Sequence, residues 1–95
     1  TGGENVYSTE VENALTKHPS VATCAVIGLP DEIWGEKVHA VVVLRVGETV
    51  SEQELSEFCR DQIAGYKIPR SFAFVDSLPI SGAGKILKRE LRDQK

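Results

Sequence analysis

The spacing of apolar residues alternates along the chain between a helical period and the continuous runs of buried strands. The first segment has apolar residues at helical spacing, namely Val11, Ala14 and Leu15. Thr9–Glu12 has the Thr-x-x-Glu form of a capping box, so we expect a helix over about Ser8–Lys17, ended by Pro19. The next apolar run, Val21–Gly28, predicts a strand that is buried on at least one face.

Pro30-Asp31 is expected to start a turn, and a second strand and a second helix follow a loop at Asp31–Glu36. The run Val38–Val46 is rich in β-branched residues and too short for a buried helix of the usual length, which favours a strand. Ser51–Glu54 gives another capping box, and apolar residues on one helical face extend the predicted helix over about Ser51–Ile63. Gly65 is placed to end that helix.

The rest of the chain predicts one more strand and a short terminal helix. Tyr66–Arg70 cannot continue the second helix, because the residue before Pro69 avoids the helical region. We expect a third strand at about Ser71–Val75. Leu87 and Leu91 are four residues apart, which suggests a short helix at the end. The expected fold is α+β, with a central three-stranded sheet flanked by helices.

Length and composition fit one small globular domain over residues 1–95. The chain is 41% hydrophobic and 26% charged, and no apolar run approaches the roughly 20 residues that span a bilayer. Since no signal-like leader opens the chain, we expect a cytoplasmic protein without a membrane span. Thr1–Asn5 has the composition of a loop, so we also expect the chain to be a domain cut from a larger protein.

The cysteines and histidines do not favour metal or disulfide chemistry. Cys24 lies in a strand-like run and Cys59 on the apolar face of a predicted helix, which is typical of buried free thiols. A disulfide or a zinc site would need closer spacing or more partners. His18 and His39 have no second ligand near them in the sequence, so no metal site is predicted.

The net charge of −3 hides an uneven distribution. Residues 1–59 hold three Lys or Arg against ten Asp or Glu, whereas residues 60–95 hold eight against four. A basic region can bind phosphates, although charge alone favours a solvated helix face that complements the helix dipole. Nucleic acid is not an expected partner, because aromatic residues are not interleaved with the basic cluster.

No complete catalytic centre is visible in the sequence. There is no paired nucleophile and base, no carboxylate dyad suggested by spacing and no Walker-type phosphate loop. What remains are loops that carry isolated cationic or aromatic groups: Gly2-Gly3, Trp34-Gly35, Tyr66-Lys67 and Gly82–Lys85. Such groups suit a lid that closes over an active site held elsewhere.

Six blocks follow one another along the chain: GGENVYSTEVE (residues 2–12), HPSV (18–21), AVIGLPDEIWGEKV (25–38), GYKIPR (65–70), FVDSLP (74–79) and GAGKILKREL (82–91). In this order they resemble the C-terminal domain of the adenylate-forming, or AMP-binding, superfamily, which includes the acyl- and aryl-CoA synthetases. The resemblance covers essentially the whole chain. The first block looks more like the CoA ligases than the peptide synthetase branch.

The resemblance implies an acid–thiol ligase, an ATP-dependent acyl-CoA synthetase, that works in two halves. A carboxylate attacks ATP to give an acyl-adenylate and pyrophosphate, and the thiol of CoA then displaces AMP. A larger N-terminal adenylation domain would hold most of the ATP and acyl sites, and the small domain would close over it in a different orientation for each half. ATP and CoA are thus the expected substrates. Mg²⁺ is expected in the full-length enzyme but not on this segment.

Lys85 matches the family's adenylation lysine, so the resemblance assigns it the catalytic role. An ammonium placed against oxygens that gain charge stabilises the transition state more than the reactants. Gly82 and Gly84 would form a flexible loop that delivers this charge for one half-reaction and withdraws it for the other. Taken alone, the Gly-Lys pair would instead indicate a solvated lysine beside a turn.

Five residues are implied as CoA contacts. Gly2 and Gly3 match a loop beside the pantetheine tunnel, where the absence of side chains lets backbone approach a narrow ligand. Trp34, Tyr66 and Arg70 match blocks that contribute to the CoA nucleotide site in some relatives, by stacking on adenine or pairing with phosphate. The alternatives are an ordinary turn at the glycines and packing roles for the aromatic residues.

A hypothesis of another class makes the domain a stand-alone binding module, or a lysine-acylation substrate that regulates such an enzyme. The lysine that matches Lys85 is a target of reversible acylation in the family. A protein lysine acetyltransferase and a deacetylase are therefore implied as partners. Acylation would remove the charge that the catalytic role requires.

Overall fold

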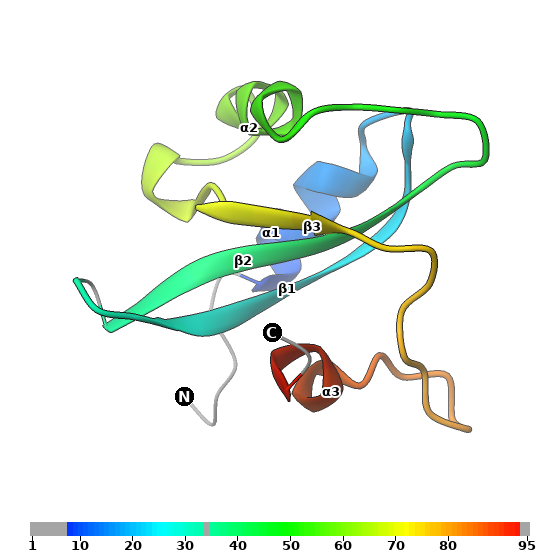
Figure 1. Cartoon of the computed structure of the whole chain (residues 1–95). Coiled ribbons are helices and arrows are strands. Elements are labelled where there is room, and N and C mark those ends of the chain that lie inside the picture. The colour runs from blue at the N-terminus through cyan, green and yellow to red at the C-terminus, as the bar shows by residue number, and fades with distance from the viewer. Residues whose placement is uncertain (1–7, 34, 94–95) are drawn as a thin grey trace.

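The computed structural model describes residues 8–33 and 35–93. Along the chain it contains helix α1 (Ser8–Thr16), strands β1 (Val21–Asp31) and β2 (Gly35–Leu44), helix α2 (Glu52–Arg60), the short 3-10 helix η1 (Gly65–Lys67), strand β3 (Ser71–Phe74) and helix α3 (Lys88–Asp93) (Figure 1). The α+β fold with a three-stranded sheet and flanking helices is therefore confirmed.

The sheet has the order β1-β2-β3, with β2 in the middle. β1 and β2 form an antiparallel hairpin that closes at the pair Asp31 and Gly35. β2 and β3 run parallel, with His39 opposite Ser71, so the chain must cross over between them, and it does so through α2 and η1. This crossover places the start of β3 beside the β1–β2 hairpin.

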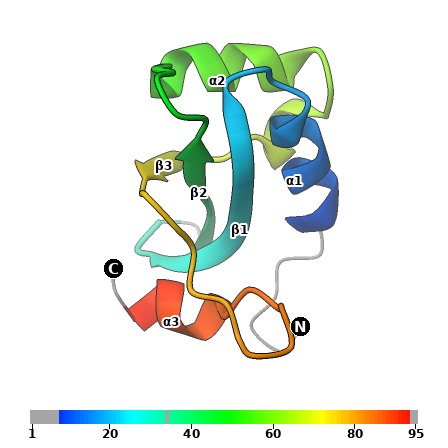
Figure 2. The same ribbon diagram turned by 90° about the vertical axis from the view of Figure 1, so that its right-hand side faces the viewer.

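Apolar residues of the sheet point alternately to two cores. On one face, α1 and α2 cover Cys24, Val26, Ala40, Val42 and Phe72. On the other face, α3 and the segment after β3 cover Ala25, Ile27, Leu29 and Val41, and contribute Leu78 and Leu91 (Figures 1 and 2). Full burial of a Val, Leu, Ile or Phe side chain contributes about 1.5–3 kcal/mol to folding. These apolar contacts therefore stabilise the packing of the helices against both faces of the sheet.

The β1–β2 hairpin is longer than the sequence predicted. The loop predicted at Asp31–Glu36 is too long, because β1 extends to Asp31 and β2 begins at Gly35. Pro30 did not end the strand: it lies in an edge strand, where a missing N–H can be tolerated, and it pairs with Glu36. β2 ends at Leu44 rather than at Val46, which is fully exposed.

The second helix begins as predicted but is shorter. The Ser51 hydroxyl caps α2 by accepting a hydrogen bond from the backbone N–H of Glu54 at 3.0 Å. The helix ends at Arg60, not at Ile63, because the chain leaves it through a turn in which the buried Ile63 still donates to the carbonyl of Cys59. Gly65 does not end the helix either, since it opens η1.

The predicted capping box at Thr9–Glu12 is wrong. Helix α1 already includes Ser8, and the carboxylate of Glu12 does not turn back to the helix start. Glu12 Oε2 instead accepts a hydrogen bond from the backbone N–H of Val26 at 2.8 Å and pairs with Lys88 Nζ at 2.9 Å. The carboxylate thus links α1 to β1 and α3.

Both cysteines are buried free thiols, as predicted. Burial raises the pKa of Cys24 to about 12 and that of Cys59 to about 11. The His18 Nδ1 accepts a hydrogen bond from the backbone of Ser20, and the His39 Nδ1 lies 2.6 Å from the Ser71 hydroxyl. No group of three His, Cys, Asp or Glu side chains in residues 8–33 and 35–93 could hold a metal ion.

Within the same described ranges, none of the helices has the length and apolar character needed to cross a membrane.

Candidate functional site

Lys85 stands at the end of a small hairpin that follows β3. Ile80 and Ile86 form an antiparallel bridge, and the backbone N–H of Ser81 donates to the carbonyl of Lys85 at 2.8 Å. Next to the bridge, on the side away from the tip, the backbone N–H of Leu87 donates to the carbonyl of Pro79 at 2.8 Å. These bonds join two short arms whose tip is residues 82–84, and we call residues 80–87 the Lys85 hairpin.

Ser81 holds the tip of the Lys85 hairpin closed. Its carbonyl accepts a hydrogen bond from Gly84 at 2.9 Å, and its hydroxyl accepts from the backbone of Ala83 and of Lys85, each at 3.2 Å. This is the pattern of a three-residue hairpin loop whose last residue has a left-handed conformation. Gly84 has that conformation, with φ +86°, whereas Gly82 does not.

The backbone of the tip favours glycine at only one of its two glycine positions. At Gly84 the left-handed backbone favours a residue without a side chain. At Gly82 an added methyl group would meet open space, and the backbone imposes no such demand. The flexible loop predicted from Gly82 and Gly84 stays a prediction, and the structure gives it a closed, hydrogen-bonded form.

The side chain of Lys85 is exposed. Within the described parts of the chain, its ammonium makes no hydrogen bond or ion pair. The neighbouring tip residues Gly82, Ala83 and Gly84 are exposed as well. The ammonium is thus free to meet an anion supplied by another domain or a ligand.

The base of the Lys85 hairpin is fixed to the rest of the fold. Leu78 and Leu91, on either side of it in the sequence, are buried in the core between the sheet and α3, and Ile86 packs against this core. Lys88, at the start of α3, pairs with Glu12 of α1. An exposed cation is therefore presented by a well-anchored hairpin.

Tyr66 and Arg70, two of the predicted CoA contacts, are exposed side chains on the segment that joins α2 to β3. The Tyr66 side chain in η1 is 71% exposed. The ammonium of the next residue, Lys67, lies 5.7 Å from the centre of the Tyr66 ring and pairs with Glu10 at 2.8 Å. Arg70 is exposed, and its backbone N–H donates to Val38 where β3 begins beside β2.

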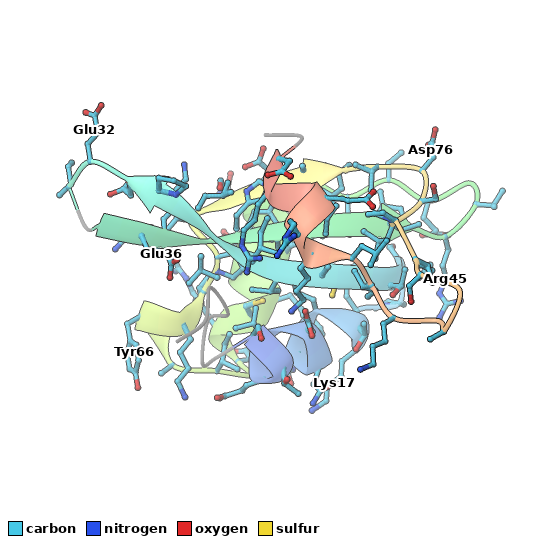
Figure 3. The ribbon with its side chains drawn as sticks, turned by 90° about the horizontal axis from the view of Figure 1, so that it is seen from below. Lys17, Glu32, Glu36, Arg45, Tyr66 and Asp76 are labelled. Atoms are coloured by element: carbon cyan, nitrogen blue, oxygen red, sulfur yellow. The ribbon has the colours of Figure 1, made fainter. Side chains whose placement is uncertain are left out.

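These two segments lie at opposite ends of the sheet. Figure 3 shows Tyr66 at the same end as Glu32 and Glu36 of the β1–β2 hairpin, and Arg45 and Asp76 at the other end. The Lys85 hairpin, orange in Figure 1, lies at this second end. The structure thus brings Tyr66 and Arg70 together with the β1–β2 hairpin, but separates them from Lys85.

Three predicted site residues, Gly2, Gly3 and Trp34, lie outside the described residues. Sequence reasoning also missed two features of the site. Ser81 organises the hairpin tip, which its position directly before Gly-Ala-Gly could have suggested. The pair between Glu12 and Lys88 joins residues far apart in the chain, and no local pattern indicates it.

Comparison with known proteins decides the family. The family model described as the AMP-binding enzyme C-terminal domain matches residues 10–85. The chain belongs to this family. The resemblance seen in the sequence blocks is thereby confirmed, and the matched region ends at Lys85.

Relatives of this AMP-binding C-terminal domain are ligases and synthases. The chain is 51% identical to the fatty acid–acyl-carrier-protein ligase ScoC of Streptomyces coeruleorubidus, over 97% of the chain and 18% of that protein. It is 52% identical to a feruloyl-CoA synthase of Amycolatopsis sp, over 97% of the chain and 19% of that protein. The solved structure of a Mycobacterium tuberculosis fatty acyl CoA synthetase aligns with a TM-score of 0.87 at 48% identity, over 99% of the chain and 18% of that structure. The chain thus spans about a fifth of the length of these relatives.

Proposed function

We propose that this chain is the mobile C-terminal domain of an ATP-dependent acyl-CoA synthetase and that Lys85 is its adenylation lysine. The observation that carries the proposal is an exposed ammonium without a partner in the described chain, held directly beside the tip of a hydrogen-bonded hairpin. The names of the relatives, a fatty acid ligase, a feruloyl-CoA synthase and a fatty acyl CoA synthetase, support the same chemistry. The remaining active-site groups are assigned to an N-terminal adenylation domain.

In the first half-reaction a carboxylate oxygen bonds to the α-phosphorus of ATP as the bond from phosphorus to the bridging oxygen of pyrophosphate breaks. Negative charge shifts onto the phosphate oxygens, and the Lys85 ammonium would stabilise that charge in the transition state. The same ammonium would hold together two anions that otherwise repel. Mg²⁺ would accompany ATP, and its carboxylate ligands are assigned to the N-terminal domain, since residues 8–33 and 35–93 contain no cluster suited to a metal.

In the second half-reaction the CoA thiol bonds to the acyl carbon and AMP leaves. We assign CoA contacts to Tyr66 and Arg70, together with Trp34, Gly2 and Gly3. Tyr66 is exposed enough to stack on adenine, and Arg70 can pair with a phosphate. Because this end lies away from Lys85, the whole domain would have to turn between the two halves, rather than bend one loop.

The acceptor of the acyl group defines a second candidate function. ScoC is named for an acyl carrier protein as acceptor, and it is as similar to this chain as the feruloyl-CoA synthase is. A carrier protein presents its thiol on a flexible arm of the same chemical type as CoA. The alternative function is therefore a ligase that transfers the acyl group to a carrier protein.

Regulation through Lys85 belongs to the same proposal. The exposed Lys85 side chain is accessible to a protein lysine acetyltransferase, and a deacetylase would reverse the modification. An acetylated side chain would carry no charge and could not stabilise the developing negative charge. We also place the enzyme in the cytoplasm, where ATP, CoA and such modifying enzymes occur together.

The test is Lys85→Ala in the full-length enzyme, with each half-reaction measured separately. We expect acid-dependent pyrophosphate exchange to fall about 10²–10³-fold, the size seen when a group that stabilises transition-state charge is removed. Thioester formation from preformed acyl-adenylate, measured with CoA and with a carrier protein, should change less than about twofold. Lys17→Ala is the matched control, because Lys17 is also an exposed lysine but lies on the α1 side. A normal exchange rate in Lys85→Ala would refute the assignment.

A further inference from the structure

One carboxylate oxygen joins three elements of the fold beneath the Lys85 hairpin. Glu12 Oε2 accepts the backbone N–H of Val26 at 2.8 Å and the Lys88 ammonium at 2.9 Å. Glu12 comes from α1, Val26 from β1 and Lys88 from the first position of α3. We call this arrangement the Glu12–Lys88 junction.

The Glu12–Lys88 junction provides a hydrogen-bond acceptor for the outer edge of the sheet. β1 is an edge strand, so the N–H groups on its outer side have no neighbouring strand to bond. Glu12 supplies an acceptor for one of them, at Val26, and Lys88 compensates the charge that this acceptor brings. A partly buried carboxylate that accepts both an N–H and an ammonium is held in one place.

The Glu12–Lys88 pair is more enclosed than the comparable pair on the same helix. Its side chains are 22% and 16% exposed, for Glu12 and Lys88 respectively. In the pair of Glu10 with Lys67, the carboxylate is 47% exposed. Enclosed charges are screened less by water and salt, so the junction is the stronger constraint of the two.

The junction is connected to Lys85 by a very short stretch of chain. Only two residues separate Lys85 from Lys88, and both are tied down: Ile86 bridges to Ile80, and Leu87 donates to the carbonyl of Pro79. Lys88 itself donates its backbone N–H to the carbonyl of Ile86 at 3.2 Å. A displacement of Lys88 is therefore passed on to Lys85.

The apolar contacts at the base of the hairpin cannot replace this constraint. Leu78, Ile86 and Leu91 hold the hairpin against the sheet, but burial of apolar surface is not directional and permits small sliding movements. The charged contact between Lys88 and Glu12 fixes a direction and a distance. Catalysis by an ammonium depends on such placement, since an error of about 1 Å can cost about 100-fold in rate.

We propose that Glu12 and Lys88 are positioning residues for the adenylation half-reaction, which set where the Lys85 ammonium stands without touching the substrates themselves. The inference rests on the proposed role of Lys85 and adds two residues to it. It also gives the two carboxylates of α1 different structural roles. Glu12 supports the Lys85 end of the domain, and Glu10, through Lys67, supports the Tyr66 end.

A direct role for Lys88 as a second cation on the phosphates is the alternative, and Glu12→Gln separates the two. The amide keeps the shape of the side chain and an oxygen that can accept from Val26, but it loses the charge that holds Lys88. If Lys88 touched phosphate, freeing it from Glu12 would preserve or raise the adenylation rate. If Lys88 positions Lys85, Glu12→Gln must slow adenylation as Lys88→Met does.

The experiment measures kcat and KM of pyrophosphate exchange in the full-length enzyme for Lys88→Met, Glu12→Gln and the double variant. We expect each single variant to lower kcat about tenfold with the KM for ATP nearly unchanged, because only transition-state alignment is lost. The double variant should be no worse than either single one, since both break the same contact. Lys88→Arg, which keeps the charge, should restore most of the rate.

Two controls separate positioning from general loss of structure. Glu10→Gln removes the other carboxylate of α1 and should leave pyrophosphate exchange unchanged. Thioester formation from preformed acyl-adenylate should be within about twofold of wild type in the Lys88→Met and Glu12→Gln variants, which a misfolded domain could not achieve.

Several outcomes would overturn the inference. It fails if Lys88→Met keeps its adenylation rate, if Glu12→Gln is harmless, or if both half-reactions fall together. When Lys85→Ala is defective and Lys88→Met is not, only the positioning role is lost. When Lys85→Ala itself adenylates normally, the proposed function fails as well.

Discussion

At the scale of single residues, the Lys85 hairpin has separate residues for its backbone conformation and for its charge. The sequence indicated Lys85 and two nearby glycines, and it suggested that both glycines serve mobility. The structure separates them, because only Gly84 has a left-handed backbone, with φ +86°. Ser81, which the sequence analysis passed over, bonds the tip through both its hydroxyl and its carbonyl. The left-handed backbone thus gives Gly84 a conformational role that Gly82 does not have, and the mobility predicted for both glycines stays a prediction.

This distinction predicts different effects for two alanine substitutions. Gly84→Ala forces a side chain into the left-handed region at about 1–2 kcal/mol, so the closed tip should be less populated and adenylation severalfold slower. Gly82→Ala meets neither a clash nor a left-handed backbone, so its adenylation rate should stay within about twofold of wild type. Pyrophosphate exchange in the full-length enzyme measures both. Equal losses in the two variants would show instead that loop freedom is what matters.

At the scale of elements, local patterns predicted the helices and strands but not how they are tied together. The capping Ser51 was found because its partner Glu54 is three residues away. The Thr9–Glu12 pattern gave a wrong prediction because the partners of Glu12 are far away in the sequence. Its carboxylate binds the backbone N–H of Val26 in β1 and the ammonium of Lys88 in α3, instead of capping α1. The end of β1 was misjudged because Pro30 breaks central strands but is tolerated at an edge. Such outcomes depend on tertiary contacts that the local sequence does not contain.

The core between the sheet and the α1–α2 layer predicts a dependence of stability on pH. Cys24 and Cys59 lie in this core, and burial raises their pKa values from 9.0 to about 12 and about 11. Above pH 9 the folded state therefore holds protons that the unfolded state releases, and stability must fall as the pH rises from about 9 toward 12.

The comparison that isolates the thiols is urea unfolding from pH 8 to 11 of wild type and a Cys24→Ala, Cys59→Ala double variant. The wild type should lose more stability than the double variant over this range, because the variant has no thiol to ionise. Alkylation of both thiols in the native protein should also be slow at pH 8. Parallel pH curves for the two proteins would contradict the predicted burial effect.

At the scale of the whole molecule, the arrangement of the two ends is what the sequence could least provide. Blocks of the family pattern located Tyr66, Arg70 and Lys85, but only the sheet order and the parallel pairing of β2 with β3 place them at opposite ends. This separation supports the proposal that the domain presents one end for adenylation and the other for transfer to the thiol. The connection between the two ends runs through α1, whose Glu10 and Glu12 each hold one of them.

The central claim is that the positive charge of Lys85, in its place on the hairpin, promotes adenylation. The most direct measurement replaces Lys85 by Nε-acetyl-lysine in the full-length enzyme, which keeps the aliphatic part of the side chain and turns the ammonium into a neutral, slightly longer amide. The same replacement at Lys17 is the control. We predict that pyrophosphate exchange falls to about the level of Lys85→Ala, while the Lys17 protein and thioester formation from acyl-adenylate are unaffected. Normal pyrophosphate exchange with acetyl-lysine at residue 85 would contradict the account.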